Sequence, residues 1–223
     1  MKKVLRVSRV LKELDRFRPD FEEIPRHLAV YSASIALADE DILKKSALLA
    51  QNAGVDIAEI YEVMLQSYLF LGFPRMLNAA ECFIESFPDF TVHLKVRKFG
   101  SGQLEKWQRS GTSLCQKVYA GNFTKLKRRI SQFSPDIFNW MILEGYGKVL
   151  SRPGLDIRRR ELAVVACLMI DKCPKQLFSH IRGALNVGVA GPFIKATIDD
   201  VSSIFKCENG PALSFLKRLG SNV

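Results

Sequence analysis

The stretch Arg158–Val189, RRRELAVVACLMIDKCPKQLFSHIRGALNVGV, predicts two consecutive helices. Asp156 can cap a helix that starts at the next residue, because its side chain can accept hydrogen bonds from free backbone N–H groups. Cys173-Pro174 ends that helix and starts another, since proline suits only the first turn of a helix. The second helix runs to a left-handed stop at Gly188. The short turn between the two helices favours an antiparallel hairpin.

Glu161, Cys173 and His180 are the candidate functional residues of this stretch. Glu161 shares an apolar stripe of the first helix. Cys173 and His180 share one face of the second helix, two turns and roughly 10 Å apart. In an antiparallel hairpin the carboxylate, thiol and imidazole could meet in one cleft, and the helix dipole would favour a thiolate at Cys173. Each residue also has a structural interpretation: an inert buried cysteine, a carboxylate paired with a neighbouring arginine, and a histidine bonded to a backbone carbonyl.

Three strings, SRPGLD at 151–156, REL at 160–162 and HIRGALNVGV at 180–189, resemble the carboxymuconolactone decarboxylase family, which includes the alkylhydroperoxidase D-like proteins. The resemblance implies an all-helical fold and assembly into trimers or hexamers with sites at subunit contacts. The decarboxylase branch of the family converts 4-carboxymuconolactone to an enol-lactone with loss of carbon dioxide. The peroxidase branch uses a Cys-x-x-Cys pair with a nearby glutamate and histidine.

The resemblance assigns roles to the three candidate residues. Glu161 and His180 match the proton-relay glutamate and histidine of the family, and Cys173 matches the first cysteine of the redox pair. Gln176 stands where the second cysteine would be, so an adjacent disulfide cannot form. Cys167 or an external thiol would have to resolve a sulfenate at Cys173.

The first half of the chain contains a degenerate copy of the same stretch. When position 26 is aligned with position 160 and no gap is introduced, positions 26–55 and 160–189 share nine of thirty residues. We call this pairing, in which each position is matched with the one 134 residues further along the chain, the repeat alignment. We therefore predict an all-α fold of two tandem alkylhydroperoxidase D-like helical repeats packed as one pseudo-symmetric unit, with residues 1–99 as the first repeat and 100–223 as the second. His27, Asp39 and Ser46 stand opposite the three candidate residues, so the first repeat lacks their chemistry.

Each repeat keeps a part that the other has lost. Residues 57–79 match the next helix and Gly-x-Pro turn of the family, whereas residues 191–213 have diverged. This pattern suggests one composite site, with the three candidate residues on one wall and a helix over Tyr61–Phe73 on the other. The alternative is ordinary divergence of a repeat that only forms core.

Composition limits the classes of partner. The chain has 33 basic and 23 acidic residues, an excess of +10 that fits a small anionic substrate or a solvated surface. The basic clusters at 125–129 and 158–160 have little aromatic interleaving and no recognised motif, so we expect no nucleic-acid binding. Five cysteines without regular spacing indicate reduced thiols, and three histidines are too few for a typical metal site. We expect no cofactor.

No apolar run approaches the roughly 18 residues that a membrane span needs. The N-terminal segment is amphipathic and has no signal-peptide core, which predicts a cytoplasmic protein without membrane contact.

Three functions remain open from the sequence. The first is a lyase in which His180 and Glu161 act as general acid and base on a small carboxylated lactone or related ring compound. The arginine pair that usually precedes this segment in the decarboxylase branch is replaced here by Cys115-Gln116. The second is a thiol peroxidase acting on a hydroperoxide through Cys173. The third is a non-catalytic member of the family. In each case the repeats predict a homo-oligomer, a trimer of two-repeat chains that imitates a hexamer.

Overall fold

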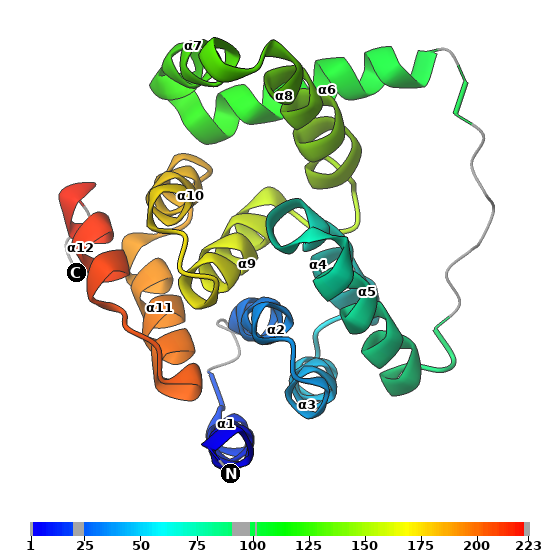
Figure 1. The fold of residues 1–223 in the computed structure, drawn as a ribbon, viewed down its shortest axis with the longest axis vertical. Coiled ribbons are helices and arrows are strands. Elements are labelled where there is room, and N and C mark those ends of the chain that lie inside the picture. The colour runs from blue at the N-terminus through cyan, green and yellow to red at the C-terminus, as the bar shows by residue number, and fades with distance from the viewer. Residues whose placement is uncertain (1, 20–24, 91–98, 101, 221–223) are drawn as a thin grey trace.

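The computed structural model describes residues 2–19, 25–90, 99–100 and 102–220, and within these ranges it contains helices and no strand (Figure 1). The predicted all-α class is confirmed. None of the helices in these ranges combines the length and the apolar character that a bilayer crossing requires. The helices are α1 (Lys2–Arg16), α2 (Arg26–Leu37), α3 (Glu40–Asn52), α4 (Ile57–Gln66), α5 (Tyr68–Ser86), α6 (Gly102–Tyr119), the 3₁₀ turn η2 (Ala120–Asn122), α7 (Phe123–Phe133), α8 (Pro135–Trp140), the π-helix η3 (Met141–Leu150), α9 (Ile157–Ile170), α10 (Pro174–Asn186), α11 (Gly191–Phe205) and α12 (Gly210–Arg218).

Helices α9 and α10 form the predicted hairpin. The Asp156 side chain accepts hydrogen bonds from the backbone N–H groups of Arg158 (2.9 Å) and Arg159 (3.3 Å) and so caps α9. Lys172 turns the chain with φ +57°, and Gly188 stops α10 with φ +93°. Helices α9 and α10 also pack against each other. Both the ends and the pairing of these helices therefore agree with the prediction from the sequence.

Helices α2 and α9 lie side by side at the centre of the protein (Figure 1). Each contains ten consecutive buried residues, 27–36 in α2 and 160–169 in α9. A helix that is apolar almost all round is buried on all sides, which is the pattern of both segments. The Ser32 hydroxyl of α2 donates a 2.7 Å hydrogen bond to the carbonyl of Ala163 in α9. Because α9 is buried on all sides, Glu161 lies in the interior.

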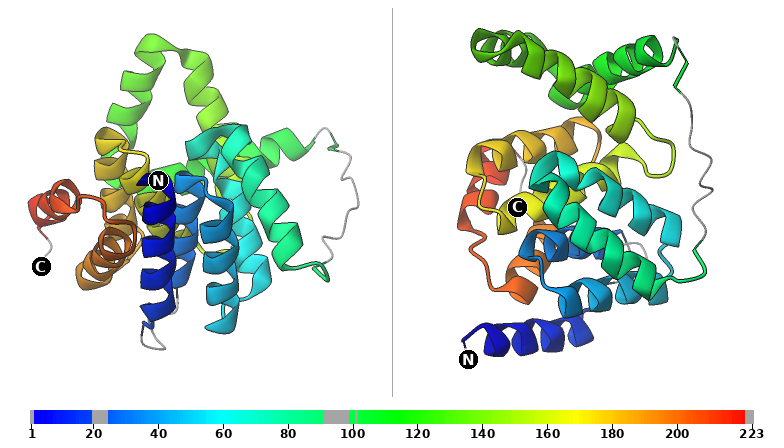
Figure 2. Two further views of the ribbon diagram at one scale, coloured as in Figure 1. Left: turned by 60° about the horizontal axis from the view of Figure 1, so that its bottom comes forward. Right: turned by 45° about the vertical axis from the view of Figure 1, so that its right-hand side comes forward.

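The two halves of the chain share their hydrophobic core. One cluster of buried side chains extends from Val10 in α1 to Leu216 in α12, and a second joins Leu28 of α2 with Ala163 of α9. Helices α6, α7 and α8 lie together at one end of the molecule, beyond α10 and α4 (Figures 1 and 2). The halves therefore fold around each other and not as separate bodies.

The contact between α6 and η3 depends on two glycines. A Cβ atom at Gly111 would lie 2.1 Å from the carbonyl oxygen of Ile142, and one at Gly147 would lie 2.2 Å from that of Trp107. Only glycine lets two backbones approach this closely. This packing fixes η3, which carries Glu144 and Tyr146 towards the candidate site.

Local backbone features recur at positions that the repeat alignment pairs. Helices α3 and α10 begin at paired positions and end at paired positions. Helices α4 and α11 also begin at paired positions. Ala38 and Lys172 have φ +56° and +57°, while Gly54 and Gly188 have φ +94° and +93°. The turns that end α2 and α3 thus recur where α9 and α10 end.

Candidate functional site

Glu161 and His180 meet in the interior. Glu161 lies in the first turns of α9 and is 1% exposed, and His180 lies in the middle of α10 and is 7% exposed. The Nδ1 atom of His180 is 2.9 Å from Oε2 of Glu161. A buried carboxylate needs such a partner, because an unpaired charge in the interior is costly. The structure therefore brings together two of the three candidate residues.

Gly183 provides the space for the Glu161 carboxylate. A Cβ atom at this position would lie 2.7 Å from Oε2 of Glu161 and 2.9 Å from Cγ1 of Val118. Gly183 follows His180 by three residues and so lies on the same side of α10. The glycine in the string HIRGALNVGV thus has a steric reason at this site.

Phe70 covers His180 from the first half of the chain. The two ring centroids are 5.3 Å apart, with the planes at 85°. Phe70 lies in a short helical segment that Gly72 interrupts with φ +78° and ψ +165°, a conformation for which glycine is suited. The preceding Tyr68 hydroxyl donates a 2.5 Å hydrogen bond to Oε1 of Glu144 in η3. One wall of the site therefore comes from α5.

The prediction of a single helix over Tyr61–Phe73 is wrong. Helix α4 ends at Gln66, and α5 is broken at Gly72, so these residues form separate segments. The Tyr61 ring packs on Phe83, 5.8 Å between centroids, and belongs to the second hydrophobic cluster. Of the predicted wall, Phe70 contacts the candidate histidine.

Three further side chains, Cys115, Tyr119 and Tyr146, lie close enough to Glu161 for its charge to raise their pKa values, and sequence reasoning gave them no role in the site. Cys115 of α6 is fully buried, and burial followed by the charge of Glu161 raises its pKa to about 12. Burial and then the same carboxylate raise the pKa of Tyr119 to about 12. Burial, then the charges of Tyr119 and Glu161, raise the pKa of Tyr146 well above its ordinary value. All three are uncharged at neutral pH. Cys115 stands where the decarboxylase branch of the family that the sequence resembles has one of its two arginines. That replacement was the sequence signal for Cys115.

Cys173 lies in a different environment. Its Sγ is 3.4 Å from Oδ2 of Asp171, and its hydrogen bonds within the described ranges involve neither Glu161 nor His180. Burial, then the hydrogen bond to Asp171 and its charge, raises the pKa of Cys173, while the charge of Arg75 opposes this. The thiolate expected from the helix dipole is therefore not favoured.

Hairpin geometry explains this separation. Cys173 lies at the turn between α9 and α10, whereas Glu161 precedes the turn by about three helical turns. In an antiparallel hairpin, residues equally far from the turn face each other, so Glu161 meets His180 and Gly183. The sequence interpretation placed all three groups in one cleft without applying this condition.

The residue before Glu161 is held by a buried ion pair. Arg160 is 0% exposed, and its Nη2 lies 2.9 Å from Oε2 of Glu62 in α4, whose carboxylate also binds Arg152 at 2.8 Å. Gln66 accepts a 3.1 Å hydrogen bond from Nη1 of Arg160. Burial raises the pKa of Glu62, but the two arginines outweigh this and lower it. This cluster fixes the start of α9, and thus Glu161, against α4.

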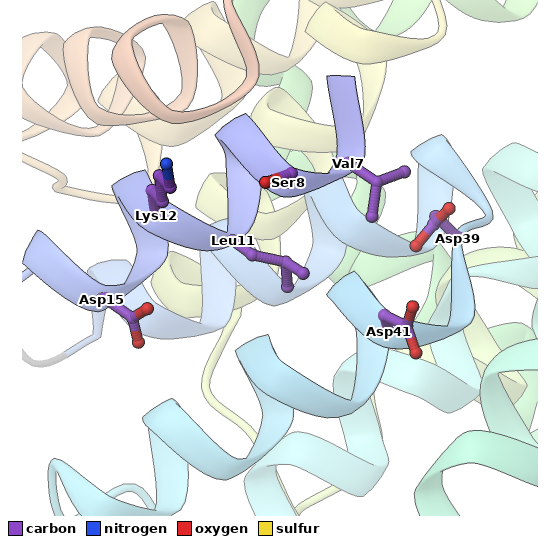
Figure 3. A pocket seen from close by; sticks show the side chains of 7 residues that line it. All are labelled: Val7, Ser8, Leu11, Lys12, Asp15, Asp39 and Asp41. Carbon is purple, nitrogen blue, oxygen red and sulfur yellow. The ribbon is translucent and has the colours of Figure 1, made fainter. Parts of the chain in front are cut away.

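Two surface clefts lie elsewhere. The larger, about 570 Å³, separates α1 from the start of α3, where Leu11, Asp15, Asp39 and Asp41 line it (Figure 3). The smaller, about 240 Å³, lies near the start of α2. In the described ranges, no group of three or more histidine, cysteine or carboxylate side chains has the geometry of a metal site. No model of a known protein family and no curated protein matches the chain.

Proposed function

We propose that this protein is a carboxymuconolactone decarboxylase-like lyase that acts by general acid–base chemistry on a small carboxylated lactone or related ring compound. The supporting observation is the 2.9 Å contact between Glu161 and Nδ1 of His180 in the interior. A carboxylate on Nδ1 keeps the proton on that nitrogen and leaves Nε2 for a substrate. The same carboxylate stabilises the imidazolium after proton transfer.

In this reaction the neutral imidazole of His180 takes the carboxylic-acid proton of the substrate at Nε2 and becomes an imidazolium. The bond between a ring carbon and the carboxylate breaks, carbon dioxide leaves, and the electron pair remains on the ring as an enolate. The His180 imidazolium then protonates the ring carbon and returns to the neutral form. Apolar surroundings strengthen the electrostatic stabilisation of such an intermediate, because water does not screen it.

Entry of a substrate requires Phe70 to move. The ring of Phe70 lies edge-on to His180, and its segment is bounded by the break at Gly72. The Tyr68–Glu144 hydrogen bond holds this segment in the closed position. Opening would expose the imidazole, and closing would exclude water from the reaction.

A thiol-peroxidase function has less support. The Cys173 thiol donates to Asp171 and has a raised pKa, so little thiolate is present at neutral pH. Cys167, a candidate resolving thiol, is fully buried and burial raises its pKa to about 12. A peroxide-reactive cysteine requires a low pKa and exposure.

The duplication and assembly belong to the same proposal. The recurrence of turns at paired positions of the repeat alignment supports two tandem repeats. A reciprocal contact also supports them: Arg160 of the second half binds Gln66 of the first, and Arg26 of the first binds Asp200 of the second, at the paired positions. We propose a trimer of such two-repeat chains, which light scattering would measure directly. A monomeric mass would contradict it.

The test is an assay of carbon dioxide release from 4-carboxymuconolactone and related carboxylated lactones. The Glu161→Gln and His180→Gln variants should lose activity by roughly 10²–10⁴-fold. Cys173→Ser should keep it, and His27→Gln, which changes the buried histidine of the first half, is the matched control. Full activity of His180→Gln would contradict the proposal. Peroxide consumption that Cys173→Ser abolishes would favour the peroxidase, and inactivity in both assays would favour a non-catalytic member.

A further inference from the structure

Helix α5 leaves an apolar stripe exposed. Phe73, Leu77 and Ile84 are between 53% and 66% exposed. Because α5 is helical from Phe73 onwards and these residues follow one another at intervals of four and seven positions, they lie along one side of the helix. Ala79 and Cys82 bury the opposite side. Helix α5 therefore packs one side into the protein and presents a second apolar side, Phe73, Leu77 and Ile84, which we call the α5 face.

A second exposed apolar surface lies where α7 meets α8, at the end of the molecule that α6, α7 and α8 form (Figures 1 and 2). Phe133 is the last residue of α7, and Ile137 and Trp140 lie on α8; the three are between 46% and 67% exposed. Phe138 is buried and packs on Phe123 of α7, with 6.2 Å between ring centroids. Ile137 and Trp140 lie outside that contact, because successive residues of a helix are turned by about 100°. We call Phe133, Ile137 and Trp140 the α8 face.

These two faces hold most of the exposed apolar surface. Six of the nine large apolar side chains that are exposed in the described residues belong to them. Single exposed apolar residues are common on any protein, but a group of large ones close together marks a contact site. Helix α5 packs on α2, α3, α4 and α9, whereas α7 and α8 pack on each other, α7 also on α6 and α8 also on η3. The two faces therefore belong to different parts of the chain.

Charged residues of opposite sign border the two faces. On α5, Glu81 and Glu85 lie beside the α5 face, and the basic residue of this helix, Arg75, pairs with Asp171. Glu85 pairs with Lys44 at 2.5 Å. Glu81 has no ion-pair partner among the described residues. The border of the α5 face is therefore acidic.

Helix α7, which leads into the α8 face, is basic. It carries no acidic side chain and four basic ones, Lys125, Lys127, Arg128 and Arg129. None of the four forms an ion pair within the described ranges. Lys125, Arg129 and Phe133 follow one another at intervals of four, so positive charge lies on the same side of α7 as one end of the α8 face.

These charges decide which faces can bind each other. Two copies joined through their α5 faces would bring Glu81 against Glu81, and two joined through their α8 faces would bring the unpaired cations of α7 together. Like charges across an interface are unfavourable, whereas opposite charges favour association and fix its orientation. The complementary pairing is therefore between an α5 face and an α8 face.

We propose that the α5 face of one copy of the chain binds the α8 face of the next. This inference rests on the trimer proposed above and names the contact that holds it. The apolar side chains of the two faces pack together, and Glu81 lies towards the cations of α7. A contact between unlike faces leaves a free face at each end of a pair, so further copies add head to tail until the ring closes.

The α5 face begins at the segment that covers the candidate site. Phe73 stacks on Tyr68, with 4.9 Å between ring centroids and 19° between the planes. The Tyr68 hydroxyl donates to Glu144, and Phe70, between Tyr68 and Phe73 in the chain, covers His180. A copy bound to Phe73 therefore covers the outer side of this segment and holds it closed.

Light scattering of two single variants tests the proposal. Leu77→Glu puts a charge into the α5 face and Trp140→Glu puts one into the α8 face. Each should weaken self-association about tenfold or more and give monomers at concentrations where the wild type is a trimer. Leu104→Glu is the matched control, because Leu104 is 54% exposed on α6 and lies outside both faces, so it should keep the wild-type mass. All three side chains are exposed, so circular dichroism should show an unchanged helix content.

Mixing the two variants is the decisive measurement. Each keeps the face that the other has lost, so a mixture of Leu77→Glu and Trp140→Glu should form a one-to-one dimer that neither forms alone. A mixture that stays monomeric would overturn the pairing, and so would a trimer mass in either single variant, which would place the contact elsewhere in the same assembly. A monomeric wild type would overturn both this contact and the proposed trimer. The lyase proposal is judged by carbon dioxide release alone, so its failure would leave these masses unchanged.

Discussion

Helices α2 and α9 occupy the centre together, but they bury different chemistry. Helix α9 buries Arg160 and Glu161, each with a partner from another helix, Glu62 and His180. Helix α2 buries His27 at the position that corresponds to Glu161, and that histidine packs on a phenylalanine ring. Both helices nevertheless end in left-handed turns of the same geometry. Turn residues and apolar positions thus fix the backbone, whereas the polar positions are free to differ as long as each buried group finds a partner.

Removing the partner of Arg160 tests this comparison most severely. Glu62→Ala leaves a guanidinium with 0% exposure without its carboxylate, and we expect a loss of about 3–5 kcal/mol in the free energy of unfolding. Asp200→Ala, which removes the carboxylate that Arg26 binds, should cost less, because the Arg26 and Asp200 side chains are 11% and 18% exposed, against 0% and 5% for Arg160 and Glu62. Urea denaturation of both variants measures the difference. Equal losses would show that the two contacts are energetically alike.

The second test uses pH to separate the two buried polar positions. The pKa of His27 is about 4 in the folded protein against the ordinary 6.5, so the unfolded chain takes up the proton first as the pH falls. The contribution of His27 to the free energy of unfolding should therefore be fully present above pH 6.5. It should decrease from there towards pH 4 and be about 2 kcal/mol smaller at pH 5.

The His27→Gln variant should lose this dependence in part. The quantity to compare is the change in unfolding free energy between pH 8 and pH 5, since the loss of ring packing on Phe17 lowers stability equally at both. An identical pH dependence in the wild type and the variant would mean that other groups cause the acid destabilisation.

The third test disturbs the Glu161 site through its glycine. Gly183→Ala places a methyl group 2.7 Å from Oε2 of Glu161, and the crowding should cost about 1–2 kcal/mol after the gain in helix propensity. Gly145→Ala is the control: its Cβ meets nothing within 4 Å, so stability should stay the same or rise. The activity proposed above should fall in the first variant and persist in the second. A Gly183→Ala variant as stable as wild type would show that the carboxylate has room to move.

Much of the fold could be predicted because it depends on local chemistry. Asp156, Pro174 and Gly188 act within one helical turn of their own positions, and the structure places helix ends at all three. The pairing of Glu161 with His180 could also be predicted, since both lie in one hairpin.

Contacts between distant segments could not be predicted from the sequence. Phe70 reaches His180 from the other half of the chain, and Cys115 and Tyr146 approach Glu161 through helices whose placement depends on tertiary packing. The sequence suggests a neighbouring arginine as a partner for Glu161, but the structure pairs Arg160 with Glu62 in a distant helix. Such contacts have no local pattern, because side-chain direction and helix packing decide them together.

The smallest expected effect concerns the caps of α3 and α10, two helices that begin at paired positions of the repeat alignment. Asp39 caps α3 by accepting a hydrogen bond from the Ile42 N–H, whereas Cys173 at the matching position makes no such bond. Cys173→Asp should therefore stabilise the protein by about 0.5–1 kcal/mol, and Asp39→Cys should destabilise it by a similar amount. Thermal unfolding measures both. If Cys173→Asp lowers stability instead, repulsion from Asp171 outweighs the cap, and the thiol is retained because it can donate a proton to that carboxylate.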